Sequence, residues 1–253
     1  MIFLDKSLKI AAVIPAAGSG RRMGEALNKV RLPLNGIPVL THALRTFLAA
    51  DQPAVDRLVL VVSESERNFF EAYLDSEWSD RMDRIEIVIG GVERQDSVYN
   101  GLESLEAWRG WSMAEQRLVI VHDAARALLT RELLSDAIRM GLEFKAVGVA
   151  VPVKDTIKQT DETGFVIATP ERATLWAIQT PQVFEYDLLL QSYRRAIGAK
   201  RYFSDDCGVV EFCGHRVKLI PGSYENIKIT TPEDLIIAAE ILRRRDDANR
   251  AGI

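Results

Sequence analysis

The feature that most constrains the fold of this chain is a regular alternation of short apolar segments with amphipathic segments. Six segments have the apolar, β-branched composition of buried strands, and they cover residues 10–15, 57–62, 84–89, 118–121, 146–151 and 217–220. Between them, apolar side chains at helical spacing occur in residues 39–50, 65–77, 97–105, 131–143, 188–196 and 232–245. This order predicts an α/β fold with a mostly parallel, Rossmann-like sheet covered by helices on both faces. Ligands of such sheets bind beyond the carboxyl ends of the strands, so we expect a functional site there.

Residues 152–176 interrupt this alternation. Two short strand-like pieces, Lys154–Lys158 and Phe165–Ala168, flank a turn sequence at residues 160–164, which predicts a β-hairpin. A hairpin arm inserted into an α/β domain has little core of its own, and such arms often pack on another subunit. We therefore expect residues 1–253 to form a single domain, with residues 152–176 as a β-hairpin arm that makes a homodimer.

Composition excludes several classes of partner. The formal net charge is −4, which argues against nucleic acid or an anionic membrane surface but allows a small anionic ligand in a local basic pocket. No apolar run approaches the roughly 20 residues that a membrane-spanning helix needs. The cysteines Cys207 and Cys213 have no metal-type cluster around them, which is typical of a reducing compartment. We expect a cytoplasmic protein.

A glycine-rich loop follows the first predicted strand, with the sequence Pro-Ala-Ala-Gly-Ser-Gly-Arg-Arg-Met-Gly at residues 15–24. Small residues let backbone amides approach phosphate closely, and Arg21, Arg22 and Lys29 add positive charge. The dinucleotide fingerprint is not met, because Met23 stands where its third glycine belongs. The P-loop pattern is not met either, because no Gly-Lys-Ser/Thr follows. The loop therefore predicts a site for a nucleoside triphosphate.

Residues 12–23 together with Lys29 resemble the signature of the 2-C-methyl-D-erythritol 4-phosphate cytidylyltransferase family. Six further segments are similar to motifs of that family in the same order, and they lie at residues 90–98, 121–126, 153–158, 175–182, 204–206 and 226–235. The resemblance extends from about Lys9 to about Leu242, and the order and spacing of the segments make it specific. The chain departs from the usual family pattern at Asn28, Val30 and Arg31 around Lys29, and at Ala127 where proline is usual.

The resemblance implies a nucleotidyltransferase that moves CMP from CTP to the phosphate of 2-C-methyl-D-erythritol 4-phosphate. Pyrophosphate leaves, and the product is an intermediate of the non-mevalonate isoprenoid precursor pathway. It also implies direct in-line attack on the α-phosphorus without a covalent enzyme intermediate, which needs positioning and charge neutralisation. The implied partners are CTP and a polyol phosphate, and the implied cofactor is Mg²⁺, because the triphosphate charge must be masked.

The resemblance also implies roles for individual residues. The catalytic set consists of Arg22, Lys29, Arg172 and Lys228. The substrate-binding set consists of Ala16, Ala17, Gly18, Gly20, Arg21, Gly91, Ser97, Asp123, Arg126, Thr156 and Thr180. Arg22 and Lys29 would stabilise the transition state, whereas Arg172 and Lys228 would orient the attacking phosphate. Because Thr156 and Arg172 lie on the arm, they would reach the site of the neighbouring subunit.

The metal ligands stay open at this stage. Asp123 is a candidate, because a carboxylate at the end of an apolar strand is costly unless it is used. Asp205 and Asp206 are a second acidic candidate, but two adjacent acids more often form a solvated turn or a helix cap. His122 precedes Asp123 on the opposite face of the chain, and we interpret it as a structural histidine.

Three other functions compete with this interpretation. A ribitol 5-phosphate cytidylyltransferase would share the loop and most of the segments. An NAD(P)-dependent oxidoreductase is disfavoured by the late glycine and by Arg21 and Arg22. A non-catalytic nucleotide-binding regulator would not need cations for both reactants.

Overall fold

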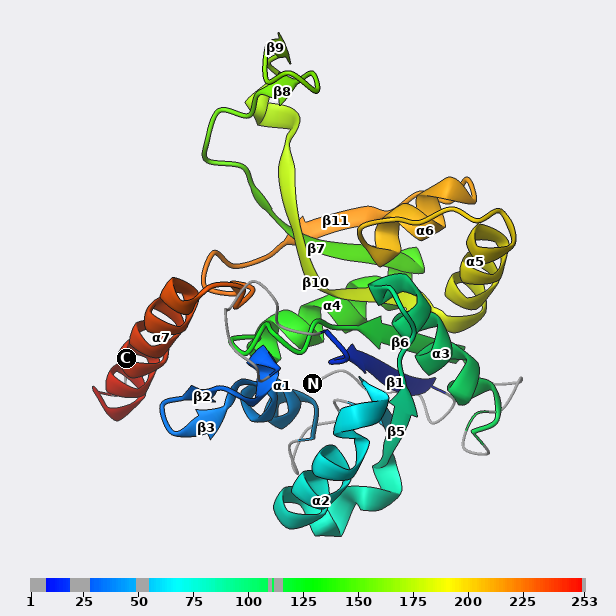
Figure 1. Cartoon of the computed structure of the whole chain (residues 1–253), viewed down its shortest axis with the longest axis vertical. Coiled ribbons are helices and arrows are strands. Elements are labelled where there is room, and N and C mark those ends of the chain that lie inside the picture. Colours follow the sequence, from blue (N-terminus) through cyan, green and yellow to red (C-terminus); the bar gives the residue numbers. More distant parts are fainter. Residues whose placement is uncertain (1–7, 19–27, 49–54, 109–110, 112–115, 252–253) are drawn as a thin grey trace.

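The computed structural model describes residues 8–18, 28–48, 55–108, 111 and 116–251. Its centre is a seven-stranded sheet with the strand order β11-β7-β10-β6-β1-β4-β5 (Figure 1). The strands are β1 (Leu8–Pro15), β4 (Arg57–Val62), β5 (Ile85–Ile89), β6 (Gln116–Val121), β7 (Ala146–Pro152), β10 (Trp176–Glu185) and β11 (Lys218–Pro221). Strand β10 is antiparallel to β6 and β7, and the other pairs in this sheet are parallel. The predicted mostly parallel α/β sheet is confirmed.

Helices cover both faces of the sheet, as predicted. One face packs against α1 (Val39–Leu48), α2 (Arg67–Trp78) and α4 (Arg131–Phe144), and the other against α3 (Arg94–Glu106), α5 (Tyr186–Gly198) and α6 (Asp206–Phe212). Alternate residues of β1 serve the two cores: Ile14 lies with α1 and α2, whereas Val13 lies with α3 and α5. A Cβ atom on Gly101 would lie 2.6 Å from Val13, so glycine allows α3 to pack closely on β1.

The last helix fixes a loop that becomes important at the site. Helix α7 (Pro232–Ala251) packs with the small hairpin of β2 (Pro33–Leu34) and β3 (Ile37–Pro38), and Ile229 is buried in the same cluster. The Ile229 amide also donates a hydrogen bond to the carbonyl of Ala125 (2.9 Å). The segment before α7 is therefore held against the loop that follows β6.

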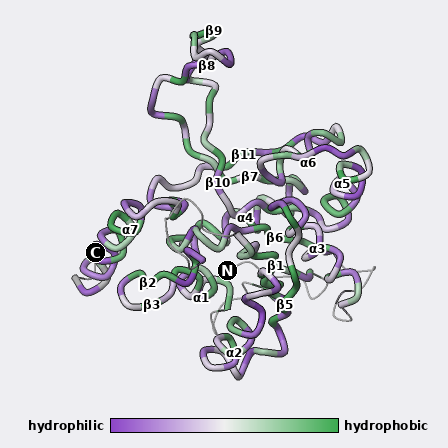
Figure 2. The backbone as a smooth tube through the Cα atoms, viewed as in Figure 1, coloured by the Kyte–Doolittle hydropathy of each residue, from purple (hydrophilic) through white to green (hydrophobic). Residues whose placement is uncertain are grey.

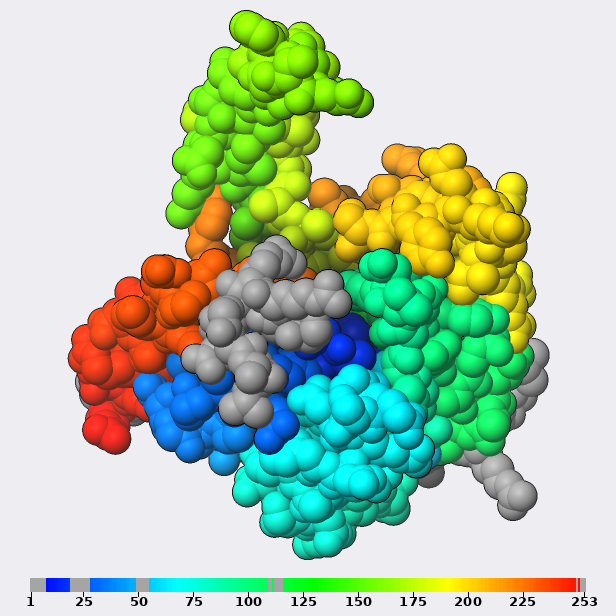
Figure 3. Space-filling view, in the orientation of Figure 1, coloured from blue at the N-terminus to red at the C-terminus, as the bar shows by residue number. Residues whose placement is uncertain are grey.

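The arm leaves the sheet where β7 ends and returns where β10 begins, so it comprises residues 153–175. It projects from the body of the molecule and carries β8 (Gln159–Thr160) and β9 (Val166–Ala168) near its tip (Figures 1 and 3). Figure 2 shows a hydrophobic stretch at β9, where Phe165, Val166 and Ile167 are 74%, 56% and 59% exposed. The arm thus presents apolar side chains that its own chain does not cover.

The prediction of a strand at Lys154–Lys158 is wrong. Strand pairing in the hairpin begins only at Gln159, opposite Ala168. Before that point the Val153 amide bonds to the carbonyl of Leu175, and the Lys154 carbonyl accepts a hydrogen bond from Arg172 (3.1 Å). These single contacts take the place of a ladder of strand hydrogen bonds.

In the described part of the chain, no helix is long and apolar enough to cross a membrane.

Candidate active site

A cavity of about 270 Å³ lies at the carboxyl ends of β1, β5 and β6. It is lined by the start of the glycine-rich loop, the segment around Lys29, the β5–α3 loop, the β6–α4 loop and Lys228. The predicted site residues in its lining are Ala16, Ala17, Gly18, Lys29, Gly91, Ser97, Asp123 and Lys228. Gly20, Arg21 and Arg22 lie outside the described residues. Residues far apart in sequence are thus brought to one place at the edge of the sheet where ligands of parallel sheets bind.

The glycine-rich loop and the β5–α3 loop approach each other closely. The Ala16 amide continues the pairing of β1 with β4 by donating to Val61 (2.7 Å). A Cβ atom on Gly90 would lie 2.8 Å from the Cβ of Ala17 and 2.7 Å from the Oγ of Ser97. Glycine at position 90 therefore lets the two backbones form one wall of the cavity.

Ser97 holds the β5–α3 loop in shape. Its Oγ accepts a hydrogen bond from the Gly91 amide (3.2 Å) and donates one to the Glu93 carbonyl (3.1 Å). Glu93 and Asp96 form a reciprocal capping box at the first turn of α3. The amino-terminal end of α3 faces the cavity, so the partial positive charge of the helix favours an anionic ligand there.

Asp123 lies between two cations at the base of the cavity. Its Oδ1 accepts a hydrogen bond from Nε of Arg94 (3.1 Å), and its Oδ2 lies 2.8 Å from Nζ of Lys228. Burial by itself raises the pKa of this carboxyl, but Arg94 and Lys228 lower it by more, so the pKa lies well below its usual range. Asp123 is therefore ionised, and it holds Lys228 at the cavity wall.

Arg94 is a site residue to which the sequence reasoning gave no role. It lines the cavity, contacts Asp123 and donates two hydrogen bonds to Asp206, at 3.2 and 2.8 Å. Asp206 is completely buried and also accepts a hydrogen bond from the Tyr193 hydroxyl. The guanidinium therefore joins the site to α5 and α6. Its place in the segment at residues 90–98 was the available signal, but its partner lies 112 positions away in the chain.

Asp205 and Asp206 follow the helix-cap interpretation, not the metal-site one. Asp205 caps α6, since its Oδ1 accepts from the Gly208 amide (3.2 Å), and Asp206 is paired with Arg94. Their carboxylates are used by the fold, which is the helix-cap alternative. Among the described residues, no group of three or more His, Cys, Asp or Glu side chains could hold a metal ion.

His122 supports the loop that carries Asp123. Its Nε2 lies 3.1 Å from the Arg126 carbonyl, which can only accept, so this nitrogen carries the proton. Its Nδ1 then accepts from the Thr180 hydroxyl (3.1 Å), and Thr180 Oγ1 in turn accepts from the Asp123 amide (3.0 Å). Burial lowers the pKa of His122 to about 4, which keeps the ring neutral. The interpretation of His122 as structural agrees with this geometry.

Arg126 and Thr180 do not line the cavity, but both contact Asp123, which does. Arg126 is 9% exposed, and it donates a hydrogen bond to the carbonyl of Asn226 (2.7 Å). Arg126 thereby ties the β6–α4 loop to the segment that carries Lys228. Thr156 and Arg172 are exposed on the arm and also lie outside the cavity of their own chain.

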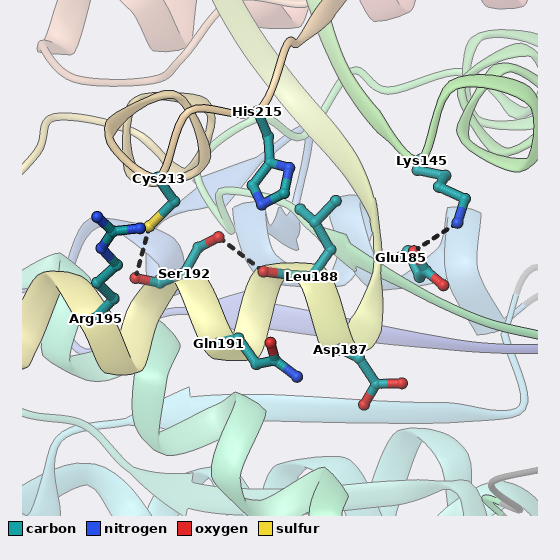
Figure 4. A pocket seen from close by; sticks show the side chains of 9 residues that line it. All are labelled: Lys145, Glu185, Asp187, Leu188, Gln191, Ser192, Arg195, Cys213 and His215. Carbon is teal, nitrogen blue, oxygen red and sulfur yellow. Dashed lines mark hydrogen bonds and ion pairs between the residues drawn. The ribbon is translucent and has the colours of Figure 1, made fainter.

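A second hollow of about 560 Å³ lies at the opposite edge of the sheet, where β7 begins and β10 ends (Figure 4). Much of its lining is paired internally: Lys145 contacts Glu185 at 3.2 Å, and the Ser192 hydroxyl bonds to the Leu188 carbonyl (2.8 Å). None of the predicted site residues lies in it. The cavity beside Asp123 is therefore the candidate site.

Comparison with known proteins agrees with this location. The sequence profile of the IspD family, 2-C-methyl-D-erythritol 4-phosphate cytidylyltransferase, matches residues 10–244. Proteins of that name from Desulforamulus reducens and Pelotomaculum thermopropionicum are 45% and 44% identical to this chain. The alignments cover 94% of this chain in both cases, and 97% and 95% of the relatives.

Solved structures with a similar fold indicate the same family. The crystal structure of 4-diphosphocytidyl-2C-methyl-D-erythritol synthase from Anaerococcus prevotii matches with a TM-score of 0.78 at 30% identity, over 94% of this chain and 100% of that chain. The 2-C-methyl-D-erythritol 4-phosphate cytidylyltransferase of Francisella tularensis matches with a TM-score of 0.73 at 28% identity, over 91% and 98%. The chain belongs to the 2-C-methyl-D-erythritol 4-phosphate cytidylyltransferase family.

Proposed function

We propose that this chain transfers CMP from CTP to the phosphate of 2-C-methyl-D-erythritol 4-phosphate and releases pyrophosphate. The observation that supports this most strongly is the composition of the cavity beside Asp123. It combines close-packed backbone of the glycine-rich loop, the amino-terminal end of α3, and the cations Lys29, Arg94 and Lys228. Such a cavity suits two anionic reactants, which must be brought together against their mutual repulsion.

The chemistry requires one displacement. An oxygen of the acceptor phosphate forms a bond to the α-phosphorus of CTP, and the bond from that phosphorus to the bridging oxygen of the β-phosphate breaks. Pyrophosphate leaves with the electron pair of that bond. Among the described residues that line the cavity there is no Cys or His, and the Ser97 hydroxyl is engaged with Gly91 and Glu93. These features favour direct attack over a covalent enzyme intermediate.

The nucleotide would lie along the two close-packed loops. Backbone of Ala16, Ala17 and Gly18 would hold the ribose and base, and Gly91 and Ser97 would recognise the cytosine. Gly20 and Arg21 would line the triphosphate. Arg22 and Lys29 would neutralise charge that develops on the α-phosphate and the leaving pyrophosphate.

The acceptor phosphate would bind near Lys228 and Arg172. Lys228 contacts Asp123 at 2.8 Å and its side chain is 39% exposed, so an incoming phosphate can share its charge. Arg172 and Thr156 would come from the arm of a second copy, and Arg126 and Thr180 would hold the acceptor side of the site from below. The exposed apolar residues of the arm would be covered in this homodimer.

We assign Mg²⁺ to the same cavity. Mg²⁺ is usually held by one or two carboxylates together with substrate phosphates, so it does not need a cluster of acidic ligands. Asp123 is a carboxylate in the lining and would be the protein ligand. The triphosphate oxygens would supply further ligands. When bound, the ion would reduce the negative charge that repels the attacking phosphate.

The two cysteines form no disulfide, which fits the reducing cytoplasm.

The relatives favour methylerythritol phosphate over the alternatives. The two relatives cited above carry that acceptor in their names, and no observation favours ribitol phosphate, a nicotinamide cofactor or a binding-only role. The test is product identification by mass spectrometry after incubation with CTP, Mg²⁺ and methylerythritol 4-phosphate. A CDP-linked alcohol is the expected product. An α-thio-CTP of single configuration should react with inversion at phosphorus, whereas retention would indicate two displacements and a covalent intermediate.

A further inference from the structure

The carboxylate of Glu66 contacts residues on both sides of Lys29 in the sequence, Asn28 and Arg31. Glu66 is the last residue of the turn η3 (Glu64–Glu66), which follows β4, and its side chain is 16% exposed. Its Oε2 accepts hydrogen bonds from Nδ2 of Asn28 (2.8 Å) and Oγ of Ser63 (3.0 Å). Its Oε1 lies 3.6 Å from Nη1 of Arg31. Glu66 itself is not among the residues that line the cavity.

Asn28 connects this carboxylate to the glycine-rich loop. The same Nδ2 that donates to Glu66 also donates to the Ala16 carbonyl (2.7 Å), and the amide oxygen accepts from the backbone of Val30 (3.4 Å). Asn28 is 6% exposed, so these bonds are protected from water. One amide thus ties together the end of β1, the turn η2 (Lys29–Arg31) and Glu66.

Arg31 provides the second attachment. Its guanidinium carbon lies 3.6 Å from the centroid of the Phe69 ring, while Nη1 faces Glu66. Arg31 is therefore held by an aromatic ring and a carboxylate at the start of α2. Lys29 is flanked at both ends of its turn by residues that contact the same carboxylate.

We propose that Glu66 is a positioning residue for Lys29 in the transfer reaction. The inference rests on the proposed function, in which Lys29 neutralises charge on the reacting phosphates. A lysine side chain has a flexible four-carbon stem, and it stabilises a transition state only if its backbone is held where the charge develops. Glu66 holds that backbone through Asn28 and Arg31, so its loss allows the turn to shift while the fold persists. Two positions at which the chain departs from the usual family pattern, Asn28 and Arg31, are the ones that Glu66 holds.

The test is a double-mutant cycle on kcat. Glu66→Ala should lower kcat by about tenfold or more, since small displacements of a positioned group have effects of that size. In a Lys29→Ala background the same substitution should change kcat by less than about twofold, because Glu66 acts through Lys29. Glu66→Gln keeps an oxygen for Asn28 and Ser63 and should retain more activity than Glu66→Ala. Glu64→Ala, at an exposed position of the same turn, is the matched control and should leave kcat unchanged.

The outcomes separate this inference from the proposed function. If Lys29→Ala keeps full turnover, the role of Lys29 is wrong and the inference falls with it. If Lys29→Ala is impaired but Glu66→Ala and Glu66→Gln are not, the inference alone is wrong. An equal loss from Glu66→Ala in both backgrounds would show a general structural effect and would also overturn it. Melting temperatures of each variant report whether the fold persists.

Discussion

The ion pair between Arg94 and Asp206 allows a quantitative prediction about stability. Asp206 is 0% exposed, and two nitrogens of Arg94 donate to its oxygens at 2.8 and 3.2 Å. Arg94→Met keeps an apolar stem but leaves the buried carboxylate without its cation. Breaking a buried pair from one side costs about 3–5 kcal/mol. Because the Tyr193 hydroxyl still donates to Asp206, we expect a loss near the lower end, about 3 kcal/mol in the free energy of unfolding.

The matched control is another arginine that contacts two carboxylates. Arg194 lies 2.7 Å from Glu103 and 2.8 Å from Glu106, but its side chain is 43% exposed. Exposed pairs contribute about 0–1 kcal/mol, because water screens the charges and solvates each partner after the other is removed. Arg194→Met should therefore cost less than about 1 kcal/mol.

A second substitution tests the cause of the loss. Asp206→Asn in the Arg94→Met background removes the unpaired buried charge, so the double variant should be more stable than Arg94→Met alone. The assay is urea unfolding followed by circular dichroism at pH 7, with the midpoint and slope compared between variants. The reasoning is refuted if Arg94→Met and Arg194→Met cost the same, or if adding Asp206→Asn lowers stability further.

Three further predictions concern His122, the proposed sharing of the site between subunits, and the arm. The pKa of His122 is about 4 in the folded chain and about 6.5 when unfolded, so the unfolded chain binds the extra proton between these values. Between pH 7 and pH 5 the free energy of unfolding of the wild type should therefore fall by about 2 kcal/mol more than that of His122→Gln. Parallel pH profiles of this free energy for the two proteins would contradict the prediction. Mixing Arg172→Ala with Lys228→Ala chains should restore about a quarter of wild-type activity, because half of the dimers are mixed and each has one intact site; no recovery would count against a shared site. Phe165→Asp should shift the proposed dimer to monomer in sedimentation experiments while the circular dichroism spectrum of the folded chain stays unchanged, and an unchanged sedimentation profile would remove the arm from the interface.

Much of the fold could be predicted because its strands are buried on both faces. Leu58–Val62 is apolar throughout and buried, and the predicted bounds of this strand, Arg57–Val62, are those of β4. Strand β10 could not be predicted in this way. Its centre is Gln179-Thr180-Pro181-Gln182, and polar residues with a proline argue against a central strand. The strand accommodates these residues because its pairing with β7 shifts register between Ile178 and Gln182. The buried Gln182 side chain is also satisfied, since its amide oxygen accepts hydrogen bonds from the backbone amides of Asp206 and Cys207.

The site could be predicted only in part, for a related reason. The residues at strand ends, such as Asp123 and Gly91, follow from the sheet topology and from the family resemblance, and they line one cavity. Their supports come from distant segments. Asp206 contacts Arg94 across 112 positions and Glu66 contacts Asn28 across 38, and neither pairing has a local sequence signal. The helix-cap interpretation of the adjacent acids Asp205 and Asp206 agrees with the structure for Asp205, but the pairing of Asp206 with Arg94 could not be predicted for this reason.

The most direct test of the proposed function is the initial rate of pyrophosphate release from CTP in the presence of Mg²⁺. Methylerythritol 4-phosphate and ribitol 5-phosphate would be compared as acceptors at equal concentration, with a reaction lacking acceptor as the blank. We expect release with methylerythritol 4-phosphate and none above the blank with ribitol 5-phosphate. Release with ribitol 5-phosphate alone would contradict the acceptor assignment, and release with neither would contradict the proposed activity.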